Sequence, residues 1–135
     1  SVQNYERFYW PGLHRAICAI LDAGMTPLVF CEGRYHSRLE ILRSVPKGKV
    51  IFLFEDVDFA RAKQVLGNVA CIAGGMPTGS LIYETPDQVA DQTKRMLDLC
   101  APGGGYIMSN SIALDQASPA NMEAWRDTLL TYGVY

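Results

Sequence analysis

Short apolar runs recur along the chain, and each run ends in polar residues or glycine. Four of them lie in residues 27–36, 50–56, 69–75 and 105–110. The five consecutive apolar residues 50–54 are typical of a parallel strand that is covered on both faces. Side chains at the carboxyl ends of parallel strands face a common pocket. The pattern therefore predicts an enzyme-like pocket at the ends of four strands.

Helical patterns separate these strands. Pro11 precedes apolar residues at helical spacing, and Gly24 supplies a left-handed stop. The residues from Ser37 to Glu40 have the form of a capping box that opens a short helix. We therefore expect a long first helix before the first strand and a short second helix after it.

Cap residues also mark the three later helices. Asp58 precedes a helical pattern over 59–66, Thr85 to Gln88 forms a second capping box, and Ser118 precedes Pro119. The order is a helix followed by four β/α units, which predicts a parallel sheet with right-handed crossovers. An open doubly wound sheet and part of an eight-stranded barrel both fit this order.

The length favours half of a barrel. A complete (β/α)8 barrel needs about 250 residues, and this chain has 135. No linker or low-complexity segment interrupts it, so we expect a single domain over 1–135. The chain begins at Ser1 without a methionine and is dense in aromatic residues over 5–10. We expect a C-terminal fragment of a longer barrel, in which these aromatic residues and one sheet edge form an exposed patch.

The composition narrows the class of protein. Hydrophobic residues make up 49% and charged residues 19%, which is a globular balance, and the net charge is −2. The sequence has no cluster of Lys and Arg, so we do not expect nucleic acid as a partner. No apolar run is long enough to cross a membrane, and the given sequence shows no signal-peptide pattern. The cysteines at 18, 31, 71 and 100 lack metal-binding spacing, so we expect reduced, mostly buried thiols in a cytoplasmic protein.

Polar residues at the ends of the first two strands are the main candidates for chemistry. Cys31 is a candidate ligand or nucleophile, and its alternative role is a thiol in the core. Glu55 and His36 are candidates for proton transfer, although His36 has the alternative of an ordinary loop position. Glu32, Arg34 and Asp56 are candidate substrate contacts. Alternatively, Glu32 and Arg34 form an ion pair on the surface, and Asp56 caps the next helix.

The last two strands contribute fewer candidates. Gly74 and Gly75 would let a substrate approach the backbone closely, or would form a tight turn. Asn110 lies at the end of the final strand, where it could bind substrate as a third catalytic residue. Cys71 lies inside its strand and is expected in the core. The glycines at 103–105 precede a strand instead of opening a helix, which is the wrong context for binding phosphate.

Several segments in order resemble the C-terminal half of the uroporphyrinogen decarboxylase superfamily, which includes the decarboxylase of heme synthesis and methyltransferases that serve corrinoid proteins. The resemblance begins near Pro11 and implies the last four units of a (β/α)8 barrel. The resembling segments are residues 23–31, 54–58, 62–67, 72–75, 84–89, 104–108 and 117–121, followed by Tyr132 and Gly133.

The chain departs from both activities of the superfamily. The zinc-dependent methyltransferases have His-x-Cys where this chain has Val29 to Cys31, and a second cysteine where it has Ser109 to Ser111. Cys31 alone remains, so a zinc ion would need Glu32, His36 or Glu55 as further ligands, a mixed set that zinc accepts. The decarboxylases have a histidine after the last strand, where residues 111–114 contain none.

Three hypotheses follow from the resemblance. The first is a methyltransferase that moves a methyl group from a small methylated or methoxylated substrate to a corrinoid on a partner protein. The second is a tetrapyrrole decarboxylase that needs neither metal nor cofactor. The third is a non-catalytic half-barrel that pairs with a complementary N-terminal half or with a second copy of itself.

Overall fold

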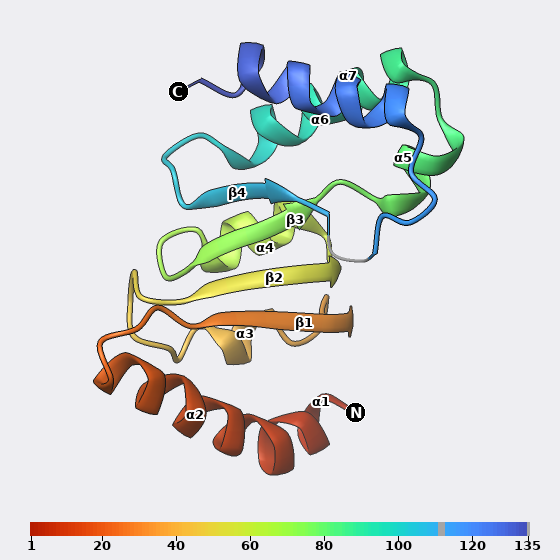
Figure 1. Ribbon diagram of the computed structural model, residues 1–135. Coiled ribbons are helices and arrows are strands. Elements are labelled where there is room, and N and C mark those ends of the chain that lie inside the picture. The colour runs from red at the N-terminus through yellow and green to blue at the C-terminus, as the bar shows by residue number, and fades with distance from the viewer. Residues whose placement is uncertain (111–112, 135) are drawn as a thin grey trace. The chain divides into compact units, whose positions relative to one another are not determined.

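The computed structural model describes residues 1–110 and 113–134, which fall into two compact units (Figure 1). The first unit spans Ser1–Ala73 and the second Gly74–Tyr135. The first contains α1 (Val2–Asn4), the π-helix η1 (Tyr5–Tyr9), α2 (Trp10–Asp22), β1 (Leu28–Arg34), α3 (Leu39–Leu42), β2 (Ile51–Asp56), α4 (Phe59–Leu66) and the start of β3 (Cys71–Gly75). The second contains the end of β3, α5 (Thr78–Tyr83), α6 (Pro86–Cys100), β4 (Tyr106–Ser109) and α7 (Pro119–Tyr132).

The strands follow one another in the order β1-β2-β3-β4. β1 pairs with β2, and β2 with β3, in parallel, so that Leu28 lies beside Ile51 and Ile51 beside Cys71. Each strand is followed by helix before the next strand begins. The predicted fold class, an α/β chain of four β/α units around a parallel sheet, is therefore confirmed.

The first strand runs three residues further than its apolar run. Cys31 lies opposite Phe54, but Arg34 lies opposite Asp56, so β1 has one extra residue in this interval. Such a β-bulge needs an unusual backbone conformation, and Gly33 supplies it with a φ of +75°. The expectation that polar residues begin after the strand was wrong here, because the bulge lets pairing continue through them.

Only one face of the sheet in the first unit is fully covered by the described residues. Helices α3 and α4 lie behind the strands in Figure 1. Phe52 and Phe54 point to the covered face and are 0% and 1% exposed, whereas Leu28 and Phe30 are 57% and 44% exposed. The expectation that β2 is buried on both faces was wrong, because Ile51 and Leu53 alternate with these phenylalanines and stay half-buried.

Helix ends follow the predicted caps in most places. Asp58 accepts a hydrogen bond from the Arg61 N–H at 3.0 Å, and Thr85 with Gln88 forms a complete capping box. α2 ends before Gly24, whose φ is +76°. The capping box at Ser37 was wrong, because α3 starts after Arg38 and has no side-chain cap.

Glu40, the other member of that expected box, forms ion pairs instead. Its carboxylate lies 3.1 Å from the guanidinium of Arg43 and 2.7 Å from that of Arg61. Ser118 stands at the N-cap of α7 as expected, but its side chain makes no capping hydrogen bond. The sequence therefore predicted where α7 begins, but the capping hydrogen bond expected from Ser118 is not formed.

The second unit has its own apolar cluster. Met76, Leu81, Val89 and Trp125 form it, and Met122 and Leu129 of α7 pack against it. The short helix α5 was not predicted. Asn121 holds its end, because the Nδ2 group donates to the carbonyl oxygens of Leu81 at 3.1 Å and Glu84 at 2.8 Å. Within the described part of the chain, no helix combines the length and the apolar character needed to cross a membrane.

Candidate functional site

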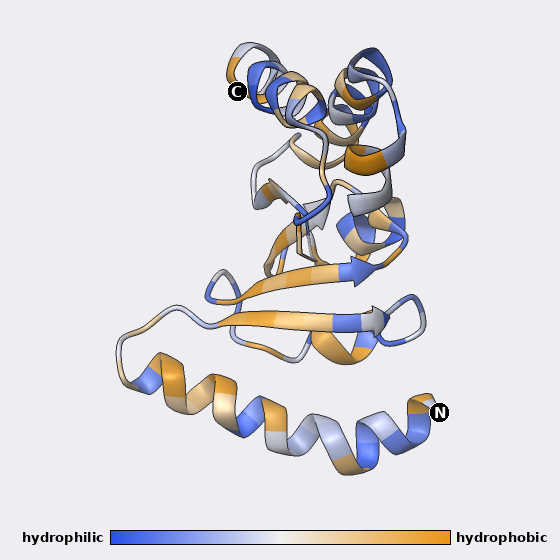
Figure 2. Cartoon of the chain, turned by 45° about the vertical axis from the view of Figure 1, so that its right-hand side comes forward, coloured by the Kyte–Doolittle hydropathy of each residue, from blue (hydrophilic) through white to orange (hydrophobic). Residues whose placement is uncertain are grey.

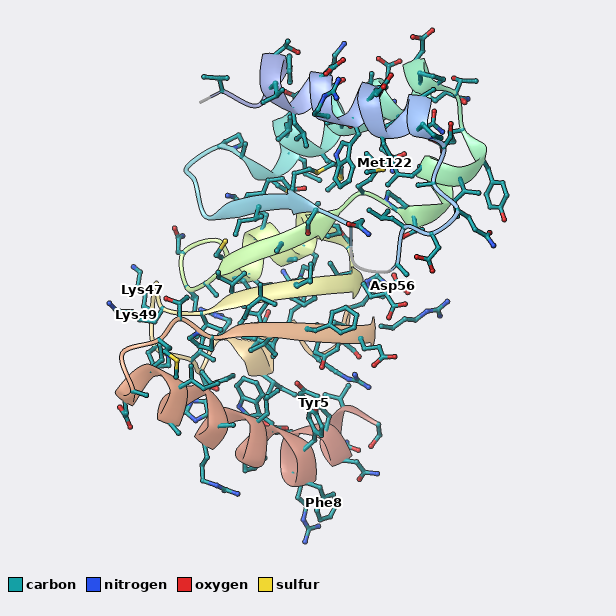
Figure 3. The ribbon with its side chains drawn as sticks, viewed as in Figure 1. Tyr5, Phe8, Lys47, Lys49, Asp56 and Met122 are labelled. Carbon is teal, nitrogen blue, oxygen red and sulfur yellow. The ribbon has the colours of Figure 1, made fainter. Side chains whose placement is uncertain are left out.

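The carboxyl ends of β1 and β2 bring several predicted site residues together. Figure 2 shows the apolar bodies of these strands ending in hydrophilic residues, and Figure 3 labels Asp56 at the end of β2. The Nε of Arg34 donates to Asp56 Oδ2 at 3.1 Å, and His36 Nε2 lies 3.3 Å from Asp56 Oδ1. Asp56 thus sits between a guanidinium and an imidazole at a solvent-accessible strand end.

His36 is engaged through both ring nitrogens. Its Nδ1 accepts a hydrogen bond from the backbone N–H of Asp58 at 2.9 Å. A neutral ring in this arrangement carries its proton on Nε2, which faces Asp56. The imidazole therefore ties the loop after β1 to the start of α4, and it must release Asp56 before Nε2 can reach a substrate.

Glu55 supports the bulge in β1. Its Oε2 accepts the backbone N–H of Gly33 at 2.6 Å, a short bond between adjacent strands. The bulge turns this N–H toward β2, and a carboxylate makes a stronger acceptor than a neutral oxygen. Glu55 is half-buried at the strand end, so a substrate could reach its carboxylate without displacing the core.

Cys31 lies in the core, apart from these polar groups. Its side chain is fully buried, and Sγ lies 3.8 Å from the Val29 carbonyl oxygen. Burial raises the pKa of the Cys31 thiol to about 12, although a hydrogen bond with Tyr35 and the charge of Arg38 act in the opposite direction. The thiol is therefore protonated at neutral pH, and only a thiolate attacks a substrate.

The residues proposed to hold zinc do not fit a metal site. Among the described residues, no three His, Cys, Asp or Glu side chains gather closely enough to hold a metal ion. Cys31 is fully buried, His36 is bound to Asp58, and Glu55 is bound to Gly33. Glu32 is an exposed residue of β1. We therefore derive no catalytic step through zinc.

The glycines at the end of β3 have a packing role. Gly74 and Gly75 have φ values of +121° and +103°, and the Tyr106 hydroxyl donates to the Gly74 carbonyl oxygen at 2.9 Å. A Cβ on Gly75 would lie 2.5 Å from that hydroxyl and 2.9 Å from the terminal methyl of Met96. The close approach of neighbouring side chains thus accounts for Gly75 without a substrate.

Asn110 follows β4 directly and is half-buried. It belongs to the second unit, whereas Arg34, His36, Glu55 and Asp56 belong to the first. The next position, Ser111, lies outside the described residues. Asn110 stays a prediction as a catalytic residue. Cys71 is only half-buried, so its expected place in the core was wrong, because its strand face is the one left partly open.

A cavity that the sequence did not reveal lies beside β1. Its volume is about 490 Å³. The aromatic residues over 5–10 were the available signal, but they were expected to form an exposed patch. Tyr5 and Trp10 are each only 7% exposed, whereas Phe8 is 69% exposed. The main side chains that line the cavity are Tyr5, Tyr9, Phe30, Glu32, Tyr35 and Arg38.

A family model described as uroporphyrinogen decarboxylase (URO-D) matches residues 1–132. The chain belongs to the uroporphyrinogen decarboxylase family. This family has the TIM-barrel fold, and the four β/α units agree with half of such a barrel. The match also includes α1 and η1, which precede the segments that showed the resemblance. The comparison with curated proteins gave no match.

Proposed function

We propose that this uroporphyrinogen decarboxylase family chain is part of a methyltransferase. The methyl group would come from a small methylated or methoxylated substrate and pass to a corrinoid on a partner protein. The observation that carries the proposal is the cavity of about 490 Å³ beside β1, which Glu32 lines near the polar end of that strand. Cavities of this size suit small ligands that are held by apolar walls and a few polar groups.

The chemistry requires a group that handles one proton. When the methyl group leaves, the bond electrons stay on the substrate oxygen or nitrogen, which then takes up a proton. A bound corrinoid would supply the nucleophile that accepts the methyl group. Glu55 is the best-placed proton carrier, because the strand end exposes part of its carboxylate. His36 would act only after leaving Asp56, and Arg34 is 85% exposed and could hold an anionic substrate group.

Spectroscopy of a corrinoid protein tests this function. The complete barrel would be mixed with a reduced corrinoid protein and a panel of methyl donors, and the absorbance of the corrinoid would be followed. We expect a change that depends on the methyl donor and slows by at least about tenfold in E55Q. The control is E123Q, on the exposed side of α7. No change with any donor would contradict methyl transfer.

Tetrapyrrole decarboxylation is the second candidate, because the matching family model bears the name of that reaction. The assay is the release of carbon dioxide from uroporphyrinogen by the complete barrel without any corrinoid. Turnover there, together with an unchanged corrinoid spectrum, would replace the first proposal by the second.

We also propose that four further β/α units complete the sheet, as the TIM-barrel fold of the family requires. β1 is one edge of the sheet, and its residues Leu28 and Phe30 expose apolar surface. Co-expression with an N-terminal half-barrel should yield a one-to-one complex by light scattering. A stable complex of two copies of this chain would instead show that a second copy is the partner.

A further inference from the structure

A cysteine and a histidine lie side by side on α2, away from the candidate site. Cys18 follows His14 by four residues, so both side chains lie on the same face of the helix. The Sγ atom of Cys18 lies 3.8 Å from Nδ1 of His14, within hydrogen-bonding range for sulfur. Cys18 is half-buried, whereas Cys31 is fully buried. The thiol of Cys18 is therefore close to a base and is partly accessible to solvent.

A backbone carbonyl fixes the tautomer of His14. Its Nε2 lies 3.1 Å from the carbonyl oxygen of Ser44, which can only accept a hydrogen bond. The neutral ring therefore carries its proton on Nε2, and Nδ1 presents a lone pair to the thiol. Trp10 holds the same segment, because its Nε1 donates to the Ser44 hydroxyl at 3.0 Å. The arrangement thus contains a nucleophile, a base and a group that orients the base.

Cys18 also lines a cavity of about 400 Å³. The other walls come from the end of α2, the turn before β1 and the segment before β2, all in the first unit. In Figure 3, Lys49 of the last segment lies at the end of the sheet opposite Asp56. Active sites of TIM barrels lie at the carboxyl ends of the strands, so this cavity is separate from the candidate catalytic end.

The cavity lies on the paired side of β1. Two of its walls, at Pro46 and Lys49, belong to the segment that leads into β2, and β2 is the strand that pairs with β1. Further strands of a barrel would add at the opposite, open side of β1. The walls of this cavity are therefore supplied by the first unit itself.

Two opposite charges line the cavity. Asp22 lies one further turn along the face of α2 that carries Cys18, and Lys49 lies across from it in the segment before β2. Both side chains are exposed, and neither forms an ion pair with another described residue. Small molecules of the amino-acid class carry an ammonium and a carboxylate, which complement these two charges.

We propose that Cys18 is a site of reversible thiol–disulfide exchange with a small disulfide of the amino-acid class. Nδ1 of His14 accepts the thiol proton, and the Cys18 thiolate attacks one sulfur of the disulfide. A new S–S bond forms as the old one breaks, and the released thiolate takes the proton from the imidazolium. Cys18 is thereby oxidised to a mixed disulfide, and the other half of the reagent is reduced to a free thiol.

The charged walls select the reagent. Lys49 binds a carboxylate of the disulfide, and Asp22 binds its ammonium group. The exchange uses neither a corrinoid nor a methyl donor, so it does not depend on the proposed methyl transfer.

Incubation of the folded chain with glutathione disulfide, followed by mass spectrometry of its peptides, tests the proposal. We expect Cys18 to gain a glutathionyl group at least about tenfold faster than Cys71, which is also half-buried but whose pKa is raised by burial. Dithiothreitol should remove the group. Equal rates at the two cysteines would overturn the proposal.

H14F tests the base. The variant keeps an aromatic ring beside Trp10, whose ring centre lies 5.6 Å from that of His14, and loses both nitrogens. It should slow the reaction of Cys18 by at least about tenfold, both with glutathione disulfide and with the uncharged bis(2-hydroxyethyl) disulfide. An unchanged rate in H14F would overturn the role of His14.

Two lysines of one turn provide a criterion that does not depend on the folding of H14F. Lys47 and Lys49 are both exposed, but only Lys49 lines the cavity (Figure 3). K49Q should slow the reaction of Cys18 with glutathione disulfide by about threefold and leave that with bis(2-hydroxyethyl) disulfide unchanged. K47Q is the matched control and should change neither rate. Equal slowing by both variants, or by neither, would overturn the proposed carboxylate contact.

Discussion

At the scale of single residues, one thiol and two phenol groups, those of Cys31, Tyr5 and Tyr35, form a buried group of uncharged side chains. Burial is the main cause that raises the pKa of Cys31 to about 12, and it also raises the pKa values of Tyr5 and Tyr35. The two tyrosine hydroxyls lie 3.5 Å apart. The folded state therefore favours the protonated form of all three side chains, and ionisation of any of them opposes folding.

Stability should therefore fall in alkaline solution. The ordinary pKa of a cysteine thiol is 9.0, so the unfolded chain loses this proton first as the pH rises. The contribution of Cys31 is complete below about pH 9 and is lost between about pH 9 and pH 12, by at most about 1.4 kcal/mol per pH unit. Urea unfolding at pH 7 and pH 10 measures this loss.

C31A should reduce the loss of stability between these two pH values, although the cavity it creates lowers stability at both. C18A, on α2, is the comparison, since Cys18 lies outside the buried group. An equal dependence on pH in the original chain and in C31A would contradict the role of Cys31.

At the scale of elements, the bulge in β1 decides where polar side chains of the strand point. Gly33 has a φ of +75°, and no atom lies within 4 Å of the position that a Cβ would take. A side chain at position 33 would therefore lower the stability of the fold mainly through backbone strain, and not through a steric clash. The same residue donates its N–H to Glu55, so the bulge and the position of the Glu55 carboxylate depend on each other.

Replacing Gly33 by alanine should destabilise the chain by about 1 kcal/mol, because an L-residue at positive φ is strained. Gly12 offers a matched control, because it lies in α2 with open space around its Cβ position and an ordinary φ. G12A should stabilise the chain by about 0.5–1 kcal/mol. Thermal unfolding of both variants measures these changes, and destabilisation by both would contradict the argument from backbone strain.

The cap of α4 gives a second prediction at this scale. D58A should lower the free energy of unfolding by about 1 kcal/mol, because the Arg61 N–H loses its acceptor. S37A should have little effect, because the side chain of Ser37 does not cap α3. Urea unfolding compares the two variants. A larger effect from S37A would show that the sequence motif, and not the observed geometry, describes the helix start.

At the scale of the whole molecule, family membership and the half-covered sheet of the first unit point to association. The exposed apolar residues Leu28 and Phe30 lie on the sheet face that the described helices leave open. A complete barrel would cover this face with its remaining strands. The chain by itself therefore presents apolar surface and an unpaired edge strand, which are both sites of self-association.

L28K should increase the monomeric fraction of the isolated chain, measured by light scattering across a range of concentrations. Leu28 is 57% exposed, so a lysine there adds charge without disturbing the core. F8S is the comparison, because Phe8 is 69% exposed on η1 and points away from the sheet. Loss of association in F8S but not in L28K would place the contact on the N-terminal helix.

The sequence by itself determined the alternation of strands and helices and the caps of α4 and α6. Runs of apolar residues and caps such as Asp58 and Thr85 are local signals, since each depends on neighbours within a few positions. The resemblance across successive segments was sufficient to identify the family that the comparison then showed. The pattern of apolar runs that end in polar residues also indicated that side chains at the ends of β1 and β2 would lie close together.

Only the tertiary structure decided what those residues do. Cys31 lies in the core, Glu55 accepts the Gly33 N–H, and the Arg38 guanidinium lies over the rings of Tyr5 and Tyr35. These contacts form because strand pairing and burial bring together residues that are far apart in the sequence. The bulge at Gly33 changes the pairing after Cys31, and an apolar-run pattern carries no record of such a shift. The cavity beside β1 depends on the same long-range contacts.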